Sequence, residues 1–212
     1  MRLRNVKGAK ELLANHDKVI EEPWLYKGKW RELFQNDNPI HIEIGMGRGK
    51  FVTTLAQQND HINYIGIEKY SSLVAKAIYK LDRVEKSNAM IIRMDAHKIE
   101  EVFQMNEINE IYLNFSDPWP KDRHAKRRLT HSNFLNKYSR ILTKNGAVCF
   151  KTDNKDLFDF SLSEFKKNQW LLKNITYNLH HSDFEGNVMT EYEERFLKMG
   201  KPIYRVEALQ KQ

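Results

Sequence analysis

Three glycines at alternate positions follow a short apolar stretch near the start of the chain. Residues 39–51 read P-I-H-I-E-I-G-M-G-R-G-K-F, with Gly45, Gly47 and Gly49 after the isoleucines. β-Branched residues that follow a proline predict a strand, and glycines let the backbone turn tightly and approach a ligand. The apolar spacing after Lys50 predicts a helix. A strand, a glycine turn and a helix are together typical of a nucleotide-binding α/β domain.

The spacing of these glycines distinguishes several classes of nucleotide site. The dinucleotide motif is G-x-G-x-x-G, and here the third glycine comes one residue early. A phosphate-binding loop needs G-x-x-x-x-G-K followed by Ser or Thr, whereas Phe51 follows Lys50 and no earlier glycine has that spacing. G-x-G-x-G after a strand that carries an acidic residue, Glu43, is the pattern of S-adenosylmethionine-dependent methyltransferases. The structural alternative is a glycine-rich turn without a ligand.

Acidic residues recur where the predicted strands end. They are Glu43, Glu68, Asp95, Asp117 and Asp153. In a mostly parallel sheet, ligands bind outside the carboxyl ends of the strands. Glu68 comes 23 residues after Gly45, close to the spacing at which a carboxylate binds ribose hydroxyls, although a solvated strand-end charge is the alternative. Asp95 is placed to accept the adenine amino group or, alternatively, to cap a helix.

A basic run follows the fourth predicted strand. Residues 121–128 read K-D-R-H-A-K-R-R directly after the turn S-D-P-W-P. The chain of 212 residues has a net charge of +7, and such an excess indicates a polyanionic partner where the basic residues cluster. We interpret the run as a phosphate-binding surface, the alternative being a solvated helix face. A second cluster lies at residues 1–10, which we interpret as either a basic arm or an inert terminus.

The alternation of predicted strands and helices indicates the fold. We expect a Rossmann-like class I S-adenosylmethionine-dependent methyltransferase fold. Its mostly parallel, seven-stranded sheet would end in an antiparallel C-terminal hairpin, formed by strands at residues 170–179 and 194–199. We expect residues 1–36 to form a basic arm and helical extension, and residues 37–212 to form the methyltransferase domain.

The composition bears on disulfides, membrane helices and metal sites. A single cysteine, Cys149, excludes an internal disulfide framework and indicates a reducing compartment, so we expect a cytoplasmic protein. No apolar run approaches the roughly 20 residues of a membrane helix. The eight histidines show no metal-ligand spacing with cysteine or carboxylates, so we expect no metal site. The sequence leaves open whether the protein is a monomer or a homodimer.

The string D-P-W-P-K-D-R-H-A-K-R-R at residues 117–128 resembles the bacterial tRNA (guanine-N7-)-methyltransferases. The resemblance extends from E-I-G-M-G-R-G at Glu43 to T-E-Y-E at residues 190–193, which is nearly the whole chain. It implies that the protein methylates N7 of a guanine in the variable loop of tRNA with S-adenosylmethionine.

The resemblance also implies roles for individual residues. The cofactor would contact the glycine turn at Gly45 and Gly47 and the carboxylates of Glu43, Glu68, Asp95 and Asp117. Asp117 would also be the catalytic residue. The substrate would contact Lys121, Asp153, Thr190, Glu191, Tyr192 and Glu193. The RNA would contact Arg123, His124, Lys126, Arg127 and Arg128.

The chemistry of N7 methylation agrees with these residue types. Guanine N7 is a lone pair with no proton to remove, so the reaction depends mainly on in-line placement. The product ring is cationic, and Asp117 would either stabilise that charge or only position the substrate. Glu191 and Glu193 would accept the N–H groups of the guanine pairing edge. A methyltransferase for another substrate and a non-catalytic RNA-binding protein are the competing interpretations.

Overall fold

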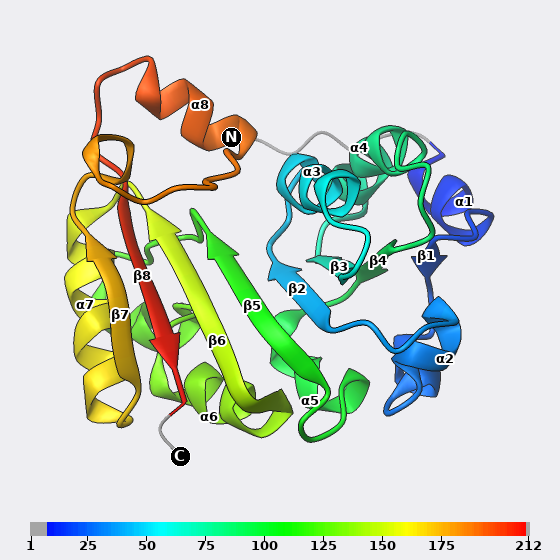
Figure 1. The fold of residues 1–212 in the computed structure, drawn as a ribbon, viewed down its shortest axis with the longest axis horizontal. Coiled ribbons are helices and arrows are strands. Elements are labelled where there is room, and N and C mark those ends of the chain that lie inside the picture. The colour runs from blue at the N-terminus through cyan, green and yellow to red at the C-terminus, as the bar shows by residue number, and fades with distance from the viewer. Residues whose placement is uncertain (1–7, 211–212) are drawn as a thin grey trace. The chain divides into compact units, whose positions relative to one another are not determined.

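The computed structural model describes residues 8–210, without the side chains of residues 9 and 10, and divides into two compact units. Unit 1 is residues 1–104 and unit 2 is residues 105–212. Figure 1 shows strands and helices alternating in both units. Most of the predicted basic arm, residues 1–10, lies outside the described part.

The described residues of unit 1 form four parallel strands in the order β1-β4-β3-β2. Its elements are α1 (Ala9–Ala14), β1 (Val19–Ile20), η1 (Pro23–Tyr26), α2 (Trp30–Phe34), β2 (Ile40–Ile44), α3 (Lys50–Gln58), β3 (Asn63–Glu68), α4 (Ser71–Leu81), β4 (Ala89–Arg93), η2 (Ala96–Lys98) and α5 (Ile99–Val102). Every residue of β2 and β3 is buried. Their β-branched isoleucines suit strands that are covered on both faces.

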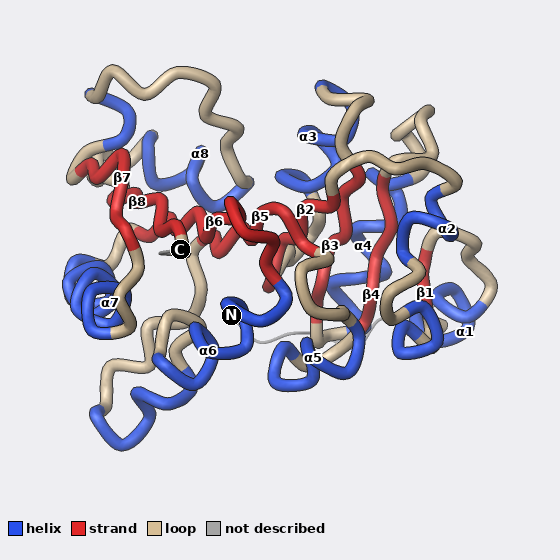
Figure 2. Tube along the Cα trace, turned by 60° about the horizontal axis from the view of Figure 1, so that its bottom comes forward, coloured by secondary structure: helices blue, strands red, loops and turns tan. Residues whose placement is uncertain are grey.

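Residues 105–210, the described part of unit 2, form four strands in the order β5-β6-β8-β7. Its elements are β5 (Ile108–Asn114), η3 (Asp122–Arg127), α6 (Ser132–Ile141), β6 (Leu142–Thr152), α7 (Lys155–Lys167), β7 (Leu171–Thr176), η4 (Leu179–His181), α8 (Glu191–Leu197) and β8 (Tyr204–Leu209). β5 and β6 are parallel, and β8 runs antiparallel to both β6 and β7. Figure 2 shows α6 and α7 on one side of these strands and α8 on the other.

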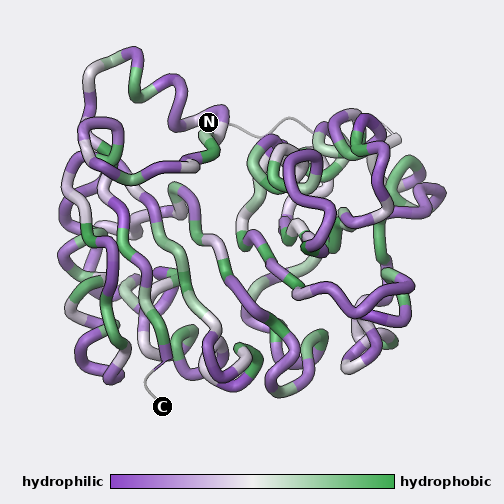
Figure 3. The backbone as a smooth tube through the Cα atoms, viewed as in Figure 1, coloured by the Kyte–Doolittle hydropathy of each residue, from purple (hydrophilic) through white to green (hydrophobic). Residues whose placement is uncertain are grey.

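The core of unit 2 forms where α6 and α7 pack on the strands. The stretch 147–150 in the middle of β6 is hydrophobic (Figure 3). Phe134 and Tyr138 of α6 are buried, as is Phe158 of α7, whose ring lies 6.3 Å from that of Phe150. This packing holds the carboxyl end of β6 in place, beside the turn after β5.

The predicted mostly parallel sheet with antiparallel C-terminal strands is confirmed. The predicted strand at residues 194–199 is wrong, because this segment belongs to helix α8 and its end, and the last strand is β8. The reason is local: Thr190 caps the helix by accepting a hydrogen bond from the Glu193 N–H at 3.0 Å. T-E-Y-E has the S/T-x-x-E spacing of a helix start, which the strand prediction overlooked.

The predicted number of strands also needs correction. The described residues form eight strands instead of seven, because Val19 and Ile20 pair with β4 as the two-residue strand β1. So short a strand has no alternating pattern for sequence reasoning to detect. None of the helices in residues 8–210 has the length and apolar character needed to cross a membrane.

Candidate active site

The glycine turn of unit 1 joins β2 to α3 in a backbone conformation that suits glycine. Gly47 and Gly49 have φ values of +59° and +74°. A Cβ atom on Gly47 would meet nothing within 4 Å, so the space beside the turn is open. A Cβ atom on Gly49 would lie 2.8 Å from the Cβ of Ala77 in α4, so this glycine permits the close packing of two helices. Gly45, at φ +79°, also faces open space.

Glu68 holds this turn through backbone hydrogen bonds. Its side chain is buried at the end of β3. One carboxylate oxygen accepts a hydrogen bond from the Gly47 N–H at 3.1 Å. The other accepts hydrogen bonds from the N–H groups of Lys69 at 2.7 Å and Tyr70 at 3.0 Å. The carboxylate that sequence analysis assigned to the cofactor therefore also shapes the glycine turn.

Asp95 caps the short helix η2 and forms an ion pair. It accepts hydrogen bonds from the His97 N–H at 3.0 Å and from Lys69 Nζ at 2.7 Å. Partial burial raises the pKa of Asp95, but the hydrogen bonds from Lys69 and His97 outweigh it and hold this pKa well below its usual range. The carboxylate is therefore ionised at neutral pH. The helix cap considered in the sequence analysis is present, and a cofactor contact stays a prediction.

Three acidic residues of unit 1 follow or end neighbouring strands at one edge of its sheet. Glu43 is buried near the end of β2, Glu68 ends β3, and Asp95 follows β4. These three strands are neighbours and run parallel, so their carboxyl ends meet at the same edge. The structure thus brings together the unit 1 residues that sequence analysis assigned to the cofactor.

In unit 2, the turn after β5 has an unusual backbone. Phe115 and Trp119 have positive φ values of +52° and +43°, which few residues other than glycine adopt and which often mark functional sites. The Phe115 N–H donates to the carbonyl of Lys151 at 2.8 Å, and this bond anchors the turn to the end of β6. Asp117 lies between the two strained residues and is exposed.

The basic run of unit 2 divides into two groups. Arg128 is half-buried and donates hydrogen bonds to the carbonyls of Pro118 at 3.1 Å and Trp119 at 3.0 Å. Its guanidinium also lies 4.3 Å from the centre of the Phe160 ring. Arg128 therefore supports the turn that carries Asp117. Exposed cations make up the second group: Lys121, Arg123, Lys126 and Arg127.

Two members of the basic run enclose the ring of Trp119. The guanidinium of Arg127 lies 4.8 Å from the ring centre. The half-buried His124 meets the ring edge-on, with 5.7 Å between centroids. Trp119 thus packs within its own turn, between the guanidinium of Arg127 and the imidazole of His124.

Several predicted substrate residues lie beside this turn. The exposed ring of Tyr192 lies 5.1 Å from the ring of Phe115 and stacks on Phe196 at 4.3 Å. Partial burial raises the pKa of Tyr192, and the nearby carboxylate of Asp153 raises it further. The turn after β5, the end of β6 and the start of α8 therefore come together in unit 2.

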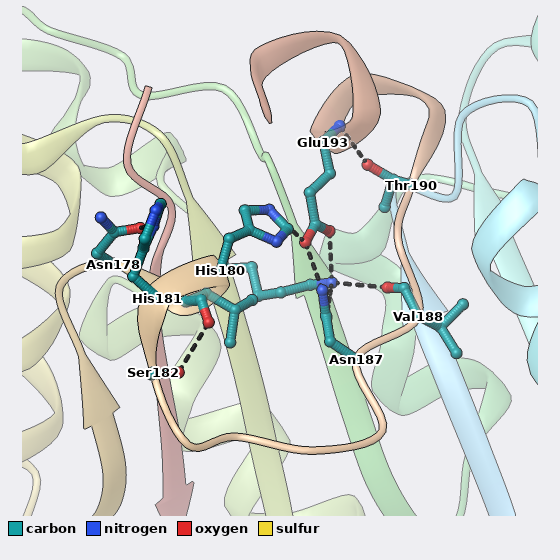
Figure 4. A network of polar contacts seen from close by, with 10 residues as sticks. Asn178, His180, His181, Ser182, Asn187, Val188, Thr190 and Glu193 are labelled. Carbon is teal, nitrogen blue, oxygen red and sulfur yellow. Dashed lines mark hydrogen bonds and ion pairs between the residues drawn. The ribbon is translucent and has the colours of Figure 1, made fainter. Parts of the chain in front are cut away.

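Glu193 differs from its neighbours because its side chain is completely buried. It forms an ion pair with Lys151 of β6 at 2.7 Å and accepts a hydrogen bond from the Asn187 side chain at 2.7 Å (Figure 4). From the sequence we expected Glu193 to accept guanine N–H groups, and Lys151 was not among the predicted site residues. One sequence feature could have indicated Lys151: it directly follows the apolar stretch A-V-C-F at residues 147–150.

No group of three or more His, Cys, Asp or Glu side chains that could hold a metal ion occurs among the described residues.

This chain is similar in sequence to known methyltransferases. A family model described as "Putative methyltransferase" matches residues 37–206. A tRNA (guanine-N(7)-)-methyltransferase of Lachnoclostridium phytofermentans is 57% identical over 209 residues, which cover 98% of each chain. One of Bacillus subtilis is 50% identical over 208 residues, again 98% of each chain.

Solved structures share the fold at low sequence identity. The 16S rRNA methyltransferase KamB matches with a TM-score of 0.64 and 11% identity, over 87% of this chain and 94% of its own. A SAM-dependent methyltransferase from Aquifex aeolicus matches with a TM-score of 0.55 and 12% identity, over 97% of this chain and 98% of its own.

The fold and the family model define the class: the protein is a methyltransferase of the Rossmann-like type. The sequence identity of 50–57% to these two relatives extends over nearly the full length of each chain, and it identifies the family within this class. The chain belongs to the bacterial tRNA (guanine-N7-)-methyltransferase family.

The contacts of Arg128 lead to a prediction about stability. Arg128→Ala should lower the free energy of unfolding by about 1–3 kcal/mol, because two carbonyls lose a charged donor. Arg123→Ala is the matched control: its side chain is exposed, and its effect should stay within about 0.5 kcal/mol. Urea denaturation measures both, and equal values for the two variants would mean that Arg128 does not support the turn.

Proposed function

We propose that this protein transfers a methyl group from S-adenosylmethionine to N7 of a guanine in the variable loop of tRNA, in the cytoplasm. The observation that carries the proposal is the grouping in unit 2 of the exposed Asp117, the half-buried Asp153 and the exposed Tyr192. This grouping combines acceptors with an accessible aromatic ring, as recognition of a purine requires. The names of the relatives support the same reaction.

The residues of unit 1 fit a nucleoside cofactor. The open space beside Gly45 and Gly47 suits a ligand that approaches the backbone closely. The carboxylates of Glu68 and Asp95 are acceptors for hydroxyl and amino groups. When bound, S-adenosylmethionine supplies the methyl group as an electrophile. These residues, with Glu43, would bind and orient it, while Asp117 of unit 2 is a further proposed contact.

The substrate residues would work mainly by placement. Because N7 carries no proton, the chain has to supply an orientation for in-line attack and not a strong base. We assign Tyr192 to stacking on the guanine, and Asp153 and Glu191 to accepting its N–H groups. The Asp117 carboxylate would face the ring, where it stabilises the positive charge that develops as the methyl group is transferred.

The exposed cations after the turn would bind the RNA backbone. Lys121, Arg123, Lys126 and Arg127 lie within one short segment, and His124 lies between them. Phosphate contacts of this kind position a nucleic acid without reading its sequence. Because Arg128 supports the turn itself, we assign the greater share of phosphate binding to the other residues.

One assay tests the proposed reaction. Purified protein is incubated with labelled S-adenosylmethionine and total tRNA that lacks the modification, and the nucleosides are then analysed. We expect label in 7-methylguanosine, at a position mapped to the variable loop. Label in another nucleoside, label only in protein or a small molecule, or RNA binding without transfer would each contradict the proposal.

The cofactor contact can be tested at Glu68. Glu68→Ala should weaken S-adenosylmethionine binding by roughly 1–3 kcal/mol, because a charged acceptor is removed and the Gly47 N–H loses its partner. Glu85→Ala removes an exposed carboxylate of the same unit and should leave the affinity unchanged. Calorimetry measures both, and unchanged affinity in Glu68→Ala would remove Glu68 from the proposed cofactor site.

Salt dependence tests the RNA contacts. The double variant Arg123→Gln with Lys126→Gln should flatten the log–log dependence of tRNA affinity on salt by roughly 0.7–0.9 for each phosphate that is no longer neutralised. The double variant Lys144→Gln with Lys166→Gln changes the net charge equally at exposed positions elsewhere in unit 2. Equal slopes for these two double variants would show that the basic run acts only through net charge.

Asp117→Ala should lower single-turnover methyl transfer by about 10²-fold, the scale for removing one preorganised electrostatic group. Binding of tRNA should remain nearly intact, since we assign it to the basic run. The rates are measured at saturating cofactor, because Asp117 is also a proposed cofactor contact.

Asp117→Asn distinguishes the two roles of this carboxylate. It keeps the size of the side chain but removes the charge. A rate near that of the alanine variant supports charge stabilisation, and a rate near that of the original protein supports positioning. Full activity in the alanine variant would show that neither role is needed.

A further inference from the structure

A buried ion pair in unit 2 joins β6 to α8. Lys151 Nζ lies 2.7 Å from Glu193 Oε2, and the two side chains are 6% and 0% exposed. Figure 4 shows the Glu193 side chain pointing from α8 toward Asn187 in the loop that leads into this helix. Two charges that have been removed from water need precise partners, because the loss of hydration opposes their burial.

The pair is surrounded by further polar contacts. Besides Glu193, Lys151 Nζ donates to Asn187 Oδ1 at 3.1 Å and to the carbonyl of Val188 at 2.9 Å. These three bonds match the three donors of an ammonium group. Asn187 Nδ2 donates to Glu193 Oε1 at 2.7 Å. His180 Nε2 lies 3.4 Å from the same oxygen, which is long for a hydrogen bond.

Both carboxylate oxygens of Glu193 are thus engaged inside the protein. Oε2 faces Lys151 and Oε1 faces Asn187. A guanine pairing edge presents two neighbouring donors and needs accessible acceptors. The carboxylate of Glu193 has no accessible surface, unlike the neighbouring ring of Tyr192.

Lys151 connects three segments that carry proposed substrate residues. Its carbonyl accepts the Phe115 N–H at 2.8 Å, two residues before Asp117. Along the chain, it lies two residues before Asp153. Its side chain reaches Glu193, directly after Tyr192. One residue therefore sets the relative positions of the turn after β5, the end of β6 and the start of α8.

We propose that Lys151 and Glu193 act together as positioning residues for the substrate guanine, and that Glu193 does not itself contact the base. The guanine part of this inference rests on the proposed function. The ion pair holds Tyr192 and its neighbours against the turn that carries Asp117. Its removal lowers the rate of methyl transfer through misplacement of these side chains.

A double-mutant cycle tests the pair. The variants are Lys151→Met, Glu193→Gln and their combination, with Lys155→Met as control because it breaks an exposed pair with Asp159 in α7. We expect each single variant to lower kcat for tRNA by about 10- to 100-fold, the scale of small misplacements. The affinities for tRNA and S-adenosylmethionine should change far less, and the combined variant should be no slower than the slower single variant.

A direct contact between Glu193 and guanine gives a different pattern. Glu193→Gln would then be slow, Lys151→Met would keep most of its rate, and the two effects would multiply in the combined variant. That pattern overturns the inference, as does a kcat equal to that of the original protein in both single variants.

Lys151→Met and Glu193→Gln each leave a buried charge unpaired, which could prevent folding. A milder variant therefore tests the same role. Asn187→Ala removes one hydrogen bond to each partner without leaving a charge unpaired. We expect a smaller decrease in kcat, with an unchanged affinity for S-adenosylmethionine. A normal kcat in Asn187→Ala, together with unchanged hydrogen exchange in the loop, would contradict the positioning role.

Hydrogen exchange separates this inference from the proposed function. Backbone amides of residues 182–192 should exchange faster in Lys151→Met and Asn187→Ala than in Lys155→Met. If the original protein transfers no methyl group to tRNA, the proposed function fails, while faster exchange still supports the holding role of the pair. Unchanged exchange in both variants overturns that role whatever the substrate is.

Discussion

Parallel pairing of neighbouring strands is the constraint on which the rest of this structure depends. When strands run parallel, their carboxyl ends meet at one edge, and the segments that leave them must share that edge. In unit 1 this brings Glu43, Glu68 and Asp95 to the ends of β2, β3 and β4. In unit 2 it brings the turn that carries Asp117 beside Asp153 at the ends of β5 and β6.

Charged groups at such an edge serve the structure as well as the chemistry. Glu68 accepts three backbone N–H groups and so holds the glycine turn. Arg128 donates to two carbonyls and so supports a turn with a strained backbone. In each case, a residue type that suggests ligand binding also stabilises a turn. The reason is that backbone groups removed from water need hydrogen-bond partners.

The separation of interacting residues along the chain explains which of these roles could be predicted from the sequence. Arg128 contacts carbonyls nine and ten residues away, yet in the sequence it is one cation among several in a basic run. Lys151 and Glu193 are 42 residues apart, and neither carries a local signal for the other. The helix α8 was missed although its T-E-Y-E start has the spacing of a capping box, because its few apolar residues also fit a short strand.

The sequence by itself determined the α/β fold, the glycine turn and the family, because each depends on a local pattern: the periodicity of apolar residues, the spacing of glycines and the string that begins at Asp117. Only the tertiary structure decided which charged side chains are enclosed and which are exposed. Burial of Glu193 and exposure of Asp117 follow from the packing of β6, α8 and the turn after β5. That packing depends on contacts between distant segments, which no local pattern specifies.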